Sequence, residues 1–272
     1  LASNGYIVIS SPSVGFDRKK VTFDRLGVQT TLSDIRFLFN YVQNLKFAQK
    51  DNIALVGFCL GSMCNMIFAE ENHFVKAVVG LHSEYLNPDS RRDYSLPDSP
   101  VFANRKLAYL ELDGSFLKHR DSEVFDKMYY SDRYQIRFSE IPHNGFTSFY
   151  VMQSHCFNKE MIRGRDNRDL TYELSCRLTL AFLNHYLKGE ANFEDNKNTI
   201  LSEQKIPESL LLADNYIAAK PAPPTKARFI EIVESGDIGN MTDTYVKARE
   251  IDPELILFGE NEYHTPKNQK RD

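Results

Sequence analysis

Short apolar runs alternate with helical patterns along the first half of the chain, and this alternation constrains the fold more than any other feature. The runs cover residues 6–9, 53–56, 77–81, 107–112 and 134–138. Most of them are continuously apolar, as expected for strands that are covered on both faces of a sheet. Helical patterns separate them at 30–45, 62–71 and 121–130. The sequence therefore predicts an α/β fold, with a mostly parallel sheet and helices on both faces.

A change of composition after residue 190 divides the chain. A long helical pattern covers 168–190 and ends with Lys188 and Gly189, which are typical of a helix C-terminus. Polar residues follow, and KPAPPT at 220–225 is typical of a stiff linker. Two short amphipathic patterns come next. We therefore predict an α/β domain at 1–190, a linker at 191–224 and a helical-hairpin extension at 225–272.

The composition argues against several classes of partner. The net charge of −4 comes from 33 basic and 37 acidic residues of mixed order, so no basic patch for nucleic acid is indicated. No apolar run approaches the ~18 residues that a membrane-spanning helix needs. A small molecule is the partner that we expect, and the sequence leaves the oligomeric state open.

The cysteines and histidines favour neither a metal site nor a disulfide framework. Four cysteines are few for a chain of 272 residues, and they lack the paired C-x-x-C spacing of a zinc site. The seven histidines are dispersed. We expect no metal and no cofactor. Reduced cysteines lean weakly towards a cytoplasmic location, but the compartment stays open because the chain starts with Leu1 and a preceding segment could hold a signal peptide.

The hexapeptide GFCLGS, residues 57–62, is the strongest candidate for chemistry. A G-x-(Ser or Cys)-x-G match occurs by chance in roughly one chain in ten of this length. Here, however, Cys59 directly follows an apolar strand and precedes a helix, the context of a nucleophile elbow. The helix N-terminus favours a thiolate, and the N–H of Leu60 is placed to stabilise an oxyanion. Gly57 and Gly61 fit the close strand–helix approach of such an elbow, where a Cβ would collide. The alternative is a small buried cysteine in a tight strand–helix turn.

A base and an acid follow in the order that this architecture requires. His143 comes just after the run at 134–138, and Asp113 just after the run at 107–112. Carboxyl ends of parallel strands meet at one rim, so His143 could shuttle a proton while Asp113 orients its ring. His155 is a rival base, and an ordinary surface histidine is the alternative for His143. Asp113 could instead be a turn residue, because Asp-Gly pairs are common in turns.

Together, GFCLGS with its strand, ELDG at 111–114 and PHNGF at 142–146 resemble the dienelactone hydrolase family of α/β-hydrolases. LASNGYIVIS and TLSDIRFLFNYV resemble further segments of that family, and the similarity covers roughly residues 1–190. The resemblance implies Cys59 as nucleophile, Asp113 as orienting acid and His143 as base. The chain differs from dienelactone hydrolases proper at Thr147, where those enzymes carry an arginine. Dienelactone itself is therefore not implied as the substrate.

The resemblance implies hydrolysis of a carboxylic ester or lactone through a covalent acyl-enzyme. Two alternatives remain open: a catalytically inactive binding protein of the same fold, and a peptidase or acyltransferase that uses the same triad. Arg91 and Arg92, in a long loop at 83–106, could meet an acidic substrate group or could simply be solvated.

The resemblance begins part-way into the family fold, so we expect the family's first strands to lie before Leu1. One of them is expected between the runs at 6–9 and 53–56. We therefore predict a gap or a non-native pairing at that place.

Overall fold

The computed structural model describes residues 1–11, 21–72, 74–83, 107–114, 125–126, 128, 130–139, 141–149, 151–152, 165–204, 206 and 210–219. The chain divides into two compact units, Leu1–Ala218 and Ala219–Asp272, and the helices and strands that the structure describes lie in the first. The predicted hairpin at 225–272 and most of the predicted helix at 121–130 lie outside the described residues. So do Arg91, Arg92 and His155.

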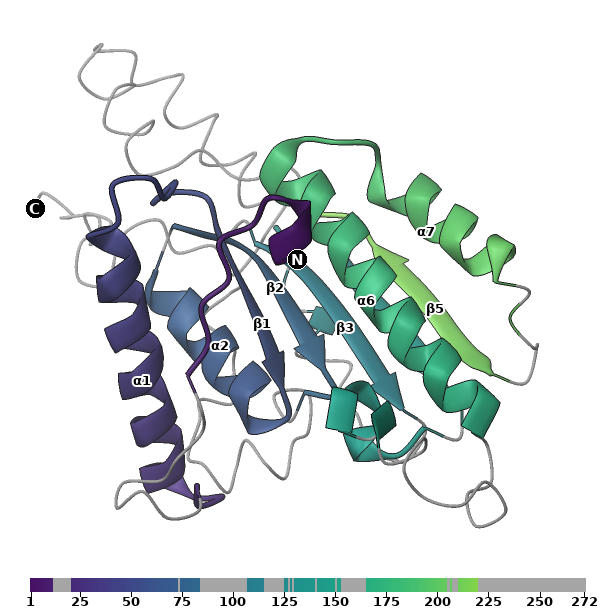
Figure 1. Cartoon of the computed structure of the whole chain (residues 1–272), viewed down its shortest axis with the longest axis horizontal. Helices are drawn as coiled ribbons and strands as arrows, with labels where there is room; N and C mark the ends of the chain where they lie inside the picture. Colours follow the sequence, from purple (N-terminus) through teal and green to yellow (C-terminus); the bar gives the residue numbers. More distant parts are fainter. Residues whose placement is uncertain are drawn as a thin grey trace, which may run out of the picture. The chain divides into compact units, whose positions relative to one another are not determined.

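A five-stranded sheet forms the centre of the first unit, in the order β1-β2-β3-β4-β5 (Figure 1). Its strands are β1 (Ile53–Phe58), β2 (Val75–Leu81), β3 (Ala108–Gly114), β4 (Arg133–Phe138) and β5 (Leu211–Ile217). The first four are parallel, and β5 runs antiparallel to β4. The predicted mostly parallel sheet is confirmed, and the carboxyl ends of β1 to β4 share one rim.

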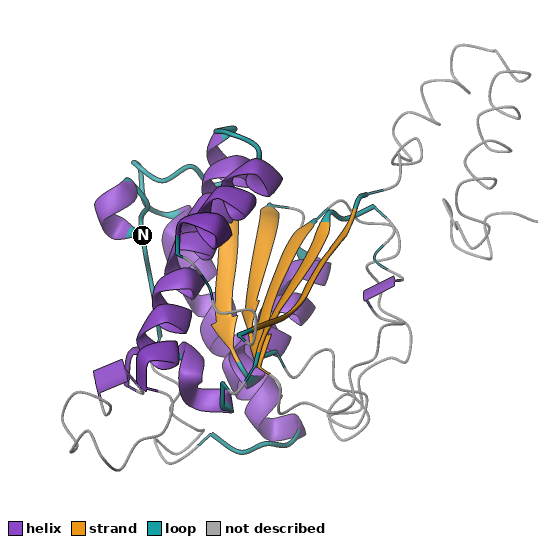
Figure 2. Ribbon diagram, turned by 90° about the vertical axis from the view of Figure 1, so that its right-hand side faces the viewer, coloured by secondary structure: helices purple, strands orange, loops and turns teal. Residues whose placement is uncertain are grey.

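Helices cover both faces of this sheet, as Figure 2 shows. The long helices are α1 (Arg25–Gln43), α2 (Leu60–Glu71), α6 (Arg165–Lys188) and α7 (Phe193–Glu203). One apolar core joins α1 and α2 to one face, and a second joins α6 and α7 to the other. Along β3, Tyr109 belongs to the first core, whereas Ala108 and Leu110 belong to the second. This alternation follows from the two-residue period of a strand and explains the continuously apolar runs.

The predicted strand at 6–9 is wrong. This segment has no regular structure, and the side chains of Ile7 and Val8 are about half exposed, at 50% and 53%. Strand preference reflects packing within a sheet, so a β-rich segment without a partner stays irregular. Tyr6 instead donates its hydroxyl to Asn184 of α6, at 2.8 Å. Among the described residues no strand pairs with the outer side of β1. Because 6–9 forms no strand, the predicted gap between two strands stays a prediction.

The predicted linker at 191–224 is also wrong over most of its described part. It contains α7 and β5, which belong to the same compact unit as the sheet. Phe193 is fully buried and Ile200 nearly so, both in the second core. Two buried side chains on one helical face are enough to fix α7 against the domain although most of its other residues are polar. The α/β unit therefore extends to Ala218.

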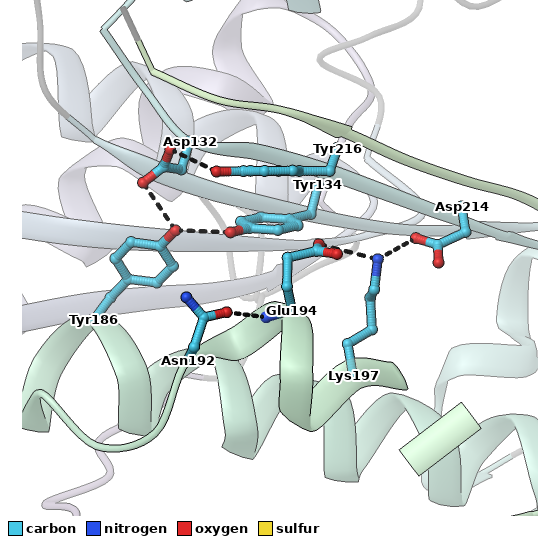
Figure 3. A network of polar contacts seen from close by, with 8 residues as sticks. All are labelled: Asp132, Tyr134, Tyr186, Asn192, Glu194, Lys197, Asp214 and Tyr216. Carbon is cyan, nitrogen blue, oxygen red and sulfur yellow. Dashed lines mark hydrogen bonds and ion pairs between the residues drawn. The ribbon is translucent and has the colours of Figure 1, made fainter. Parts of the chain in front are cut away.

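Polar contacts stabilise α7 and β5 at this edge of the sheet, as Figure 3 shows. The Lys197 ammonium lies 2.7 Å from Asp214 of β5 and 3.0 Å from Glu194. The rings of Tyr134 and Tyr216 stack across β4 and β5 with centroids 4.5 Å apart. Because Lys197 is almost wholly buried, its pairing with two carboxylates offsets the cost of burying its charge. Figure 3 also shows Asp132 accepting hydrogen bonds from Tyr186 and Tyr216.

Candidate active site

Cys59 occupies a sharp turn between β1 and α2. Its φ of 54° and ψ of −124° lie in a region that side-chain-bearing residues rarely adopt. The turn is fixed on both sides: the Cys59 N–H donates to the Leu81 carbonyl at 3.1 Å, and the Cys59 carbonyl accepts from Ser62 and Met63. The strand–turn–helix context predicted for GFCLGS is therefore confirmed, and the backbone has the strain typical of a nucleophile elbow.

The two glycines of the motif do different work. A Cβ added at Gly57 would lie 2.6 Å from the backbone N and Cα of Ser62, so only glycine lets α2 pack this closely on β1. A Cβ added at Gly61 would meet nothing within 4 Å. The prediction of a close approach is confirmed for Gly57 and wrong for Gly61. Gly61 lies on an open part of α2, where a side chain has room.

The start of α2 supplies a backbone donor beside Cys59. The hydrogen-bond ladder of the helix begins with the N–H groups of Ser62 and Met63, which donate to the Cys59 carbonyl at 3.1 and 3.3 Å. The Leu60 N–H therefore lies ahead of the ladder and has no acceptor within the helix. Figure 1 shows α2 starting at the edge to which β1, β2 and β3 point. A charge that develops on a bound carbonyl oxygen at this rim can be met by the Leu60 N–H.

His143 lies at the same rim, at the start of the short 3-10 helix η4 (His143–Phe146) that follows β4. Its imidazole centroid is 4.7 Å from that of Phe58, the residue directly before Cys59. It is also 4.6 Å from the ring of His82, which it meets edge to face. The structure thus brings His143 to the turn that holds Cys59, although 84 positions separate the two in the sequence.

Asp113 lies inside β3 and is fully buried. Its Oδ1 accepts from Arg137 Nε and its Oδ2 from Gln135 Nε2, each at 3.0 Å. Arg137 is its direct partner in the register of β3 and β4. Both carboxylate oxygens are therefore engaged by β4, which makes Asp113 a cross-strand anchor. An ionised carboxylate offers about four acceptor positions, so these two bonds leave acceptor capacity.

Two further buried polar residues, not predicted from the sequence, lie near this rim. His82 directly follows β2, is almost fully buried, and has a positive φ of 54° like Cys59. Glu111 of β3 is fully buried, and its carboxylate accepts from the Ser83 N–H and the Tyr109 hydroxyl. The signal for His82 was present, because it follows an apolar strand run as His143 does. Nothing local to Glu111 distinguishes it from other carboxylates.

Cys64 lies one helical turn further along α2 and is a structural residue. It is fully buried in the first core, with Sγ 3.9 Å from the Val28 carbonyl. Burial raises the pKa of the Cys64 thiol to about 12, against the smaller opposing effect of a hydrogen bond with Thr31. A thiol in this state is a poor nucleophile at neutral pH. Cys59 is also buried in this core and differs from Cys64 in its strained backbone.

Within the described ranges, no three histidine, cysteine, aspartate or glutamate side chains gather as ligands for a metal ion. No helix of the described part of the chain is both long and apolar enough to cross a membrane.

Comparison with known proteins supports the α/β-hydrolase class. The model of the dienelactone hydrolase family matches residues 16–104, a span that contains α1, β1, the Cys59 turn and α2. The resemblance seen in the sequence is therefore confirmed over this span. No curated protein matches the chain.

Among solved structures, the ferulic acid esterase from Streptomyces cinnamoneus matches with 15% sequence identity and a TM-score of 0.42. The match covers 61% of this chain and 50% of the esterase, so this chain spans about half the length of that structure.

Proposed function

We propose that this chain hydrolyses a carboxylic ester or lactone, with Cys59 as nucleophile, His143 as general base and Asp113 as orienting acid. The observation that carries the proposal is the backbone of Cys59. A residue other than glycine keeps a strained conformation only where its surroundings impose it, and such residues gather at functional sites. Here the strained residue is a cysteine between β1 and α2, in the span that matches the dienelactone hydrolase family.

The chemistry follows in two balanced steps. His143 takes the Cys59 proton, Sγ attacks the ester carbonyl carbon, and the oxyanion that forms is met by the Leu60 N–H. The carbon–oxygen bond to the leaving alkoxide then breaks, and His143 returns its proton to that alkoxide. In the second step His143 removes a proton from water, the hydroxide attacks the thioester, and the Cys59 thiol leaves with the proton. The products are a carboxylic acid and an alcohol.

Asp113 has less support than Cys59 and His143, so it needs a test of its own. The role of Cys59 is supported by its strained backbone and its place at the start of α2. The role of His143 is supported by the contact of its ring with Phe58. Asp113 has a buried position near the rim, but both of its oxygens already bind β4. Asp113→Asn tests its role, with Arg137→Gln as the matched control. If Asp113 orients His143, Asp113→Asn lowers kcat roughly 10⁴-fold and Arg137→Gln does not.

The test of the proposed function is hydrolysis of p-nitrophenyl acetate and p-nitrophenyl butyrate by the full chain. We expect turnover that is lost with iodoacetamide and in Cys59→Ala. The control Cys176→Ser changes an exposed cysteine and should keep full activity. Turnover that survives both iodoacetamide and Cys59→Ala excludes Cys59 as the nucleophile. Binding of an ester without turnover would instead support the inactive binding protein that the sequence left open.

A further inference from the structure

His82 stands out because its backbone is strained although the proposed chemistry does not use it. Cys59 and His82 are the two non-glycine residues with positive φ among those the structure describes, and both have φ of 54°. They follow neighbouring strands at matching positions, since Phe58 pairs with Leu81 at the ends of β1 and β2. A histidine in this conformation costs roughly 1–3 kcal/mol, so the surrounding contacts must hold it there.

Three contacts from β3 hold the turn at His82. The His82 N–H donates to the Leu112 carbonyl at 2.7 Å, and the next N–H, that of Ser83, donates to Glu111 Oε1 at 2.8 Å. The ring is held as well, because His82 Nδ1 accepts from the Gly114 N–H at 3.3 Å. A backbone N–H can only donate, so Nδ1 carries no proton in this arrangement.

The ring held in this way lies against the proposed base. The His82 and His143 centroids are 4.6 Å apart with the ring planes at 80°, an edge-to-face contact. The Phe58 ring also lies beside the His143 ring, with centroids 4.7 Å apart. The loop before His143 is packed closely too, because a Cβ at Gly114 would lie 2.3 Å from the Ile141 carbonyl oxygen. His143 is thus confined by ring contacts with Phe58 and His82 and by its own loop.

We propose that His82 is a positioning residue that fixes the imidazole of His143 beside the Cys59 turn. The inference rests on the proposed function, in which His143 is the base. Glu111 and Gly114 hold the turn and the ring of His82, and His82 in turn limits the orientations of His143. Catalysis is sensitive to this, because a displacement of about 1 Å in a reacting group can cost roughly 100-fold in rate.

The test uses His82→Asn in the full chain. Asparagine tolerates positive φ and its Oδ1 can accept from Gly114, so the turn is kept while the ring against His143 is lost. We expect kcat for p-nitrophenyl acetate to fall roughly 10- to 100-fold and KM to stay within about twofold. His185→Asn, at the far end of α6, is the matched control and should change neither constant. An unchanged kcat in folded His82→Asn would overturn the proposal.

A second readout does not depend on activity. In protein labelled with ¹³C-histidine, the His143 ring signals, assigned with His143→Gln, should shift in His82→Asn because the neighbouring ring is gone. Signals that stay in place would also overturn the proposal. If the wild-type protein hydrolyses no ester, the proposed function is wrong. The ring signals of His143 would still show whether His82 contacts that ring. His82→Gly serves if His82→Asn does not fold, since glycine adopts positive φ freely.

Discussion

The turns at Cys59 and His82 occupy matching places at the ends of neighbouring strands, yet they are held in different ways. The Cys59 turn combines backbone hydrogen bonds with close packing, because Gly57 lets α2 approach β1. The His82 turn is held by buried hydrogen bonds from Glu111, Leu112 and Gly114. Both turns therefore use backbone hydrogen bonds, but the strained φ of Cys59 also depends on close packing, and that of His82 on a buried carboxylate and its own ring. The close packing at Cys59 is visible in the sequence as a glycine pattern around the turn. The hydrogen bonds at His82 correspond to no such local pattern.

The largest effect should come from the polar support of the His82 turn. Glu111→Leu leaves two buried donors, the Ser83 N–H and the Tyr109 hydroxyl, without their acceptor. Each such loss costs about 1–3 kcal/mol, so we expect the free energy of unfolding to fall by about 2–6 kcal/mol. Glu111→Gln keeps an oxygen for Ser83 and should cost less than half as much. Urea denaturation measures both, and equal values for the two variants would contradict this account of the turn.

The next effect tests the packing that supports the Cys59 turn. Gly57→Ala places a methyl group 2.6 Å from the Ser62 backbone, which must shift. We expect a loss of about 1–3 kcal/mol in unfolding free energy, as for other overpacked sites. Gly61→Ala is the matched control in the same motif and should be neutral or stabilise α2 by up to about 1 kcal/mol. If the two variants were equally stable, the proposed difference between the two glycines would be wrong.

A smaller difference in stability is expected when the two strained residues are each replaced by glycine. Glycine relieves the backbone strain at either position, but His82→Gly also removes a buried ring and its bond with Gly114. We therefore expect His82→Gly to be less stable than Cys59→Gly by about 1–2 kcal/mol. Thermal unfolding of the two variants side by side measures the difference. A Cys59→Gly variant that is the less stable of the pair would reverse the comparison.

The smallest effect concerns pH and the second cysteine of α2. The pKa of Cys64 is raised by burial from 9.0 to about 12, so its neutral thiol stabilises the folded state fully below pH 9. That contribution is lost as the pH rises from 9 towards 12. We expect the stability of wild type to fall more steeply over this range than that of Cys64→Ala. Parallel slopes in urea titrations at pH 8, 9 and 10 would show that burial does not control this thiol.

Most of the sheet could be predicted because its strands are covered on both faces and read as apolar runs. The run at 6–9 misled because β propensity does not reveal whether a partner strand is present. The strand β5 was missed because it is an antiparallel edge strand that carries Asp214 and Asn215 among its apolar residues. The helix α7 was missed because most of its residues are polar, with few apolar side chains such as Phe193 and Ile200 in the core.

The site was predictable where a local pattern determines the geometry. GFCLGS predicts the turn at Cys59 because the close packing involves Gly57 and Ser62, which are only five positions apart. His143 could be placed at the rim by counting strands. His82 could be placed at the rim in the same way, but its strained conformation could not be predicted, because it depends on Glu111 and Gly114, about thirty positions later in the chain. The partners of Asp113 on β4 likewise follow from strand register, which the sequence does not reveal.

If Cys59 is the nucleophile, an acyl-enzyme forms on its Sγ, and trapping that intermediate is a direct test. The full chain is mixed briefly with p-nitrophenyl acetate, quenched in acid, and examined by intact-mass spectrometry followed by peptide mapping. We expect one acetyl group, attached at Cys59, and we expect it to accumulate in His143→Gln if the first step still proceeds with this activated ester. Active protein that carries no acetyl group, or carries it on another residue, would contradict the account.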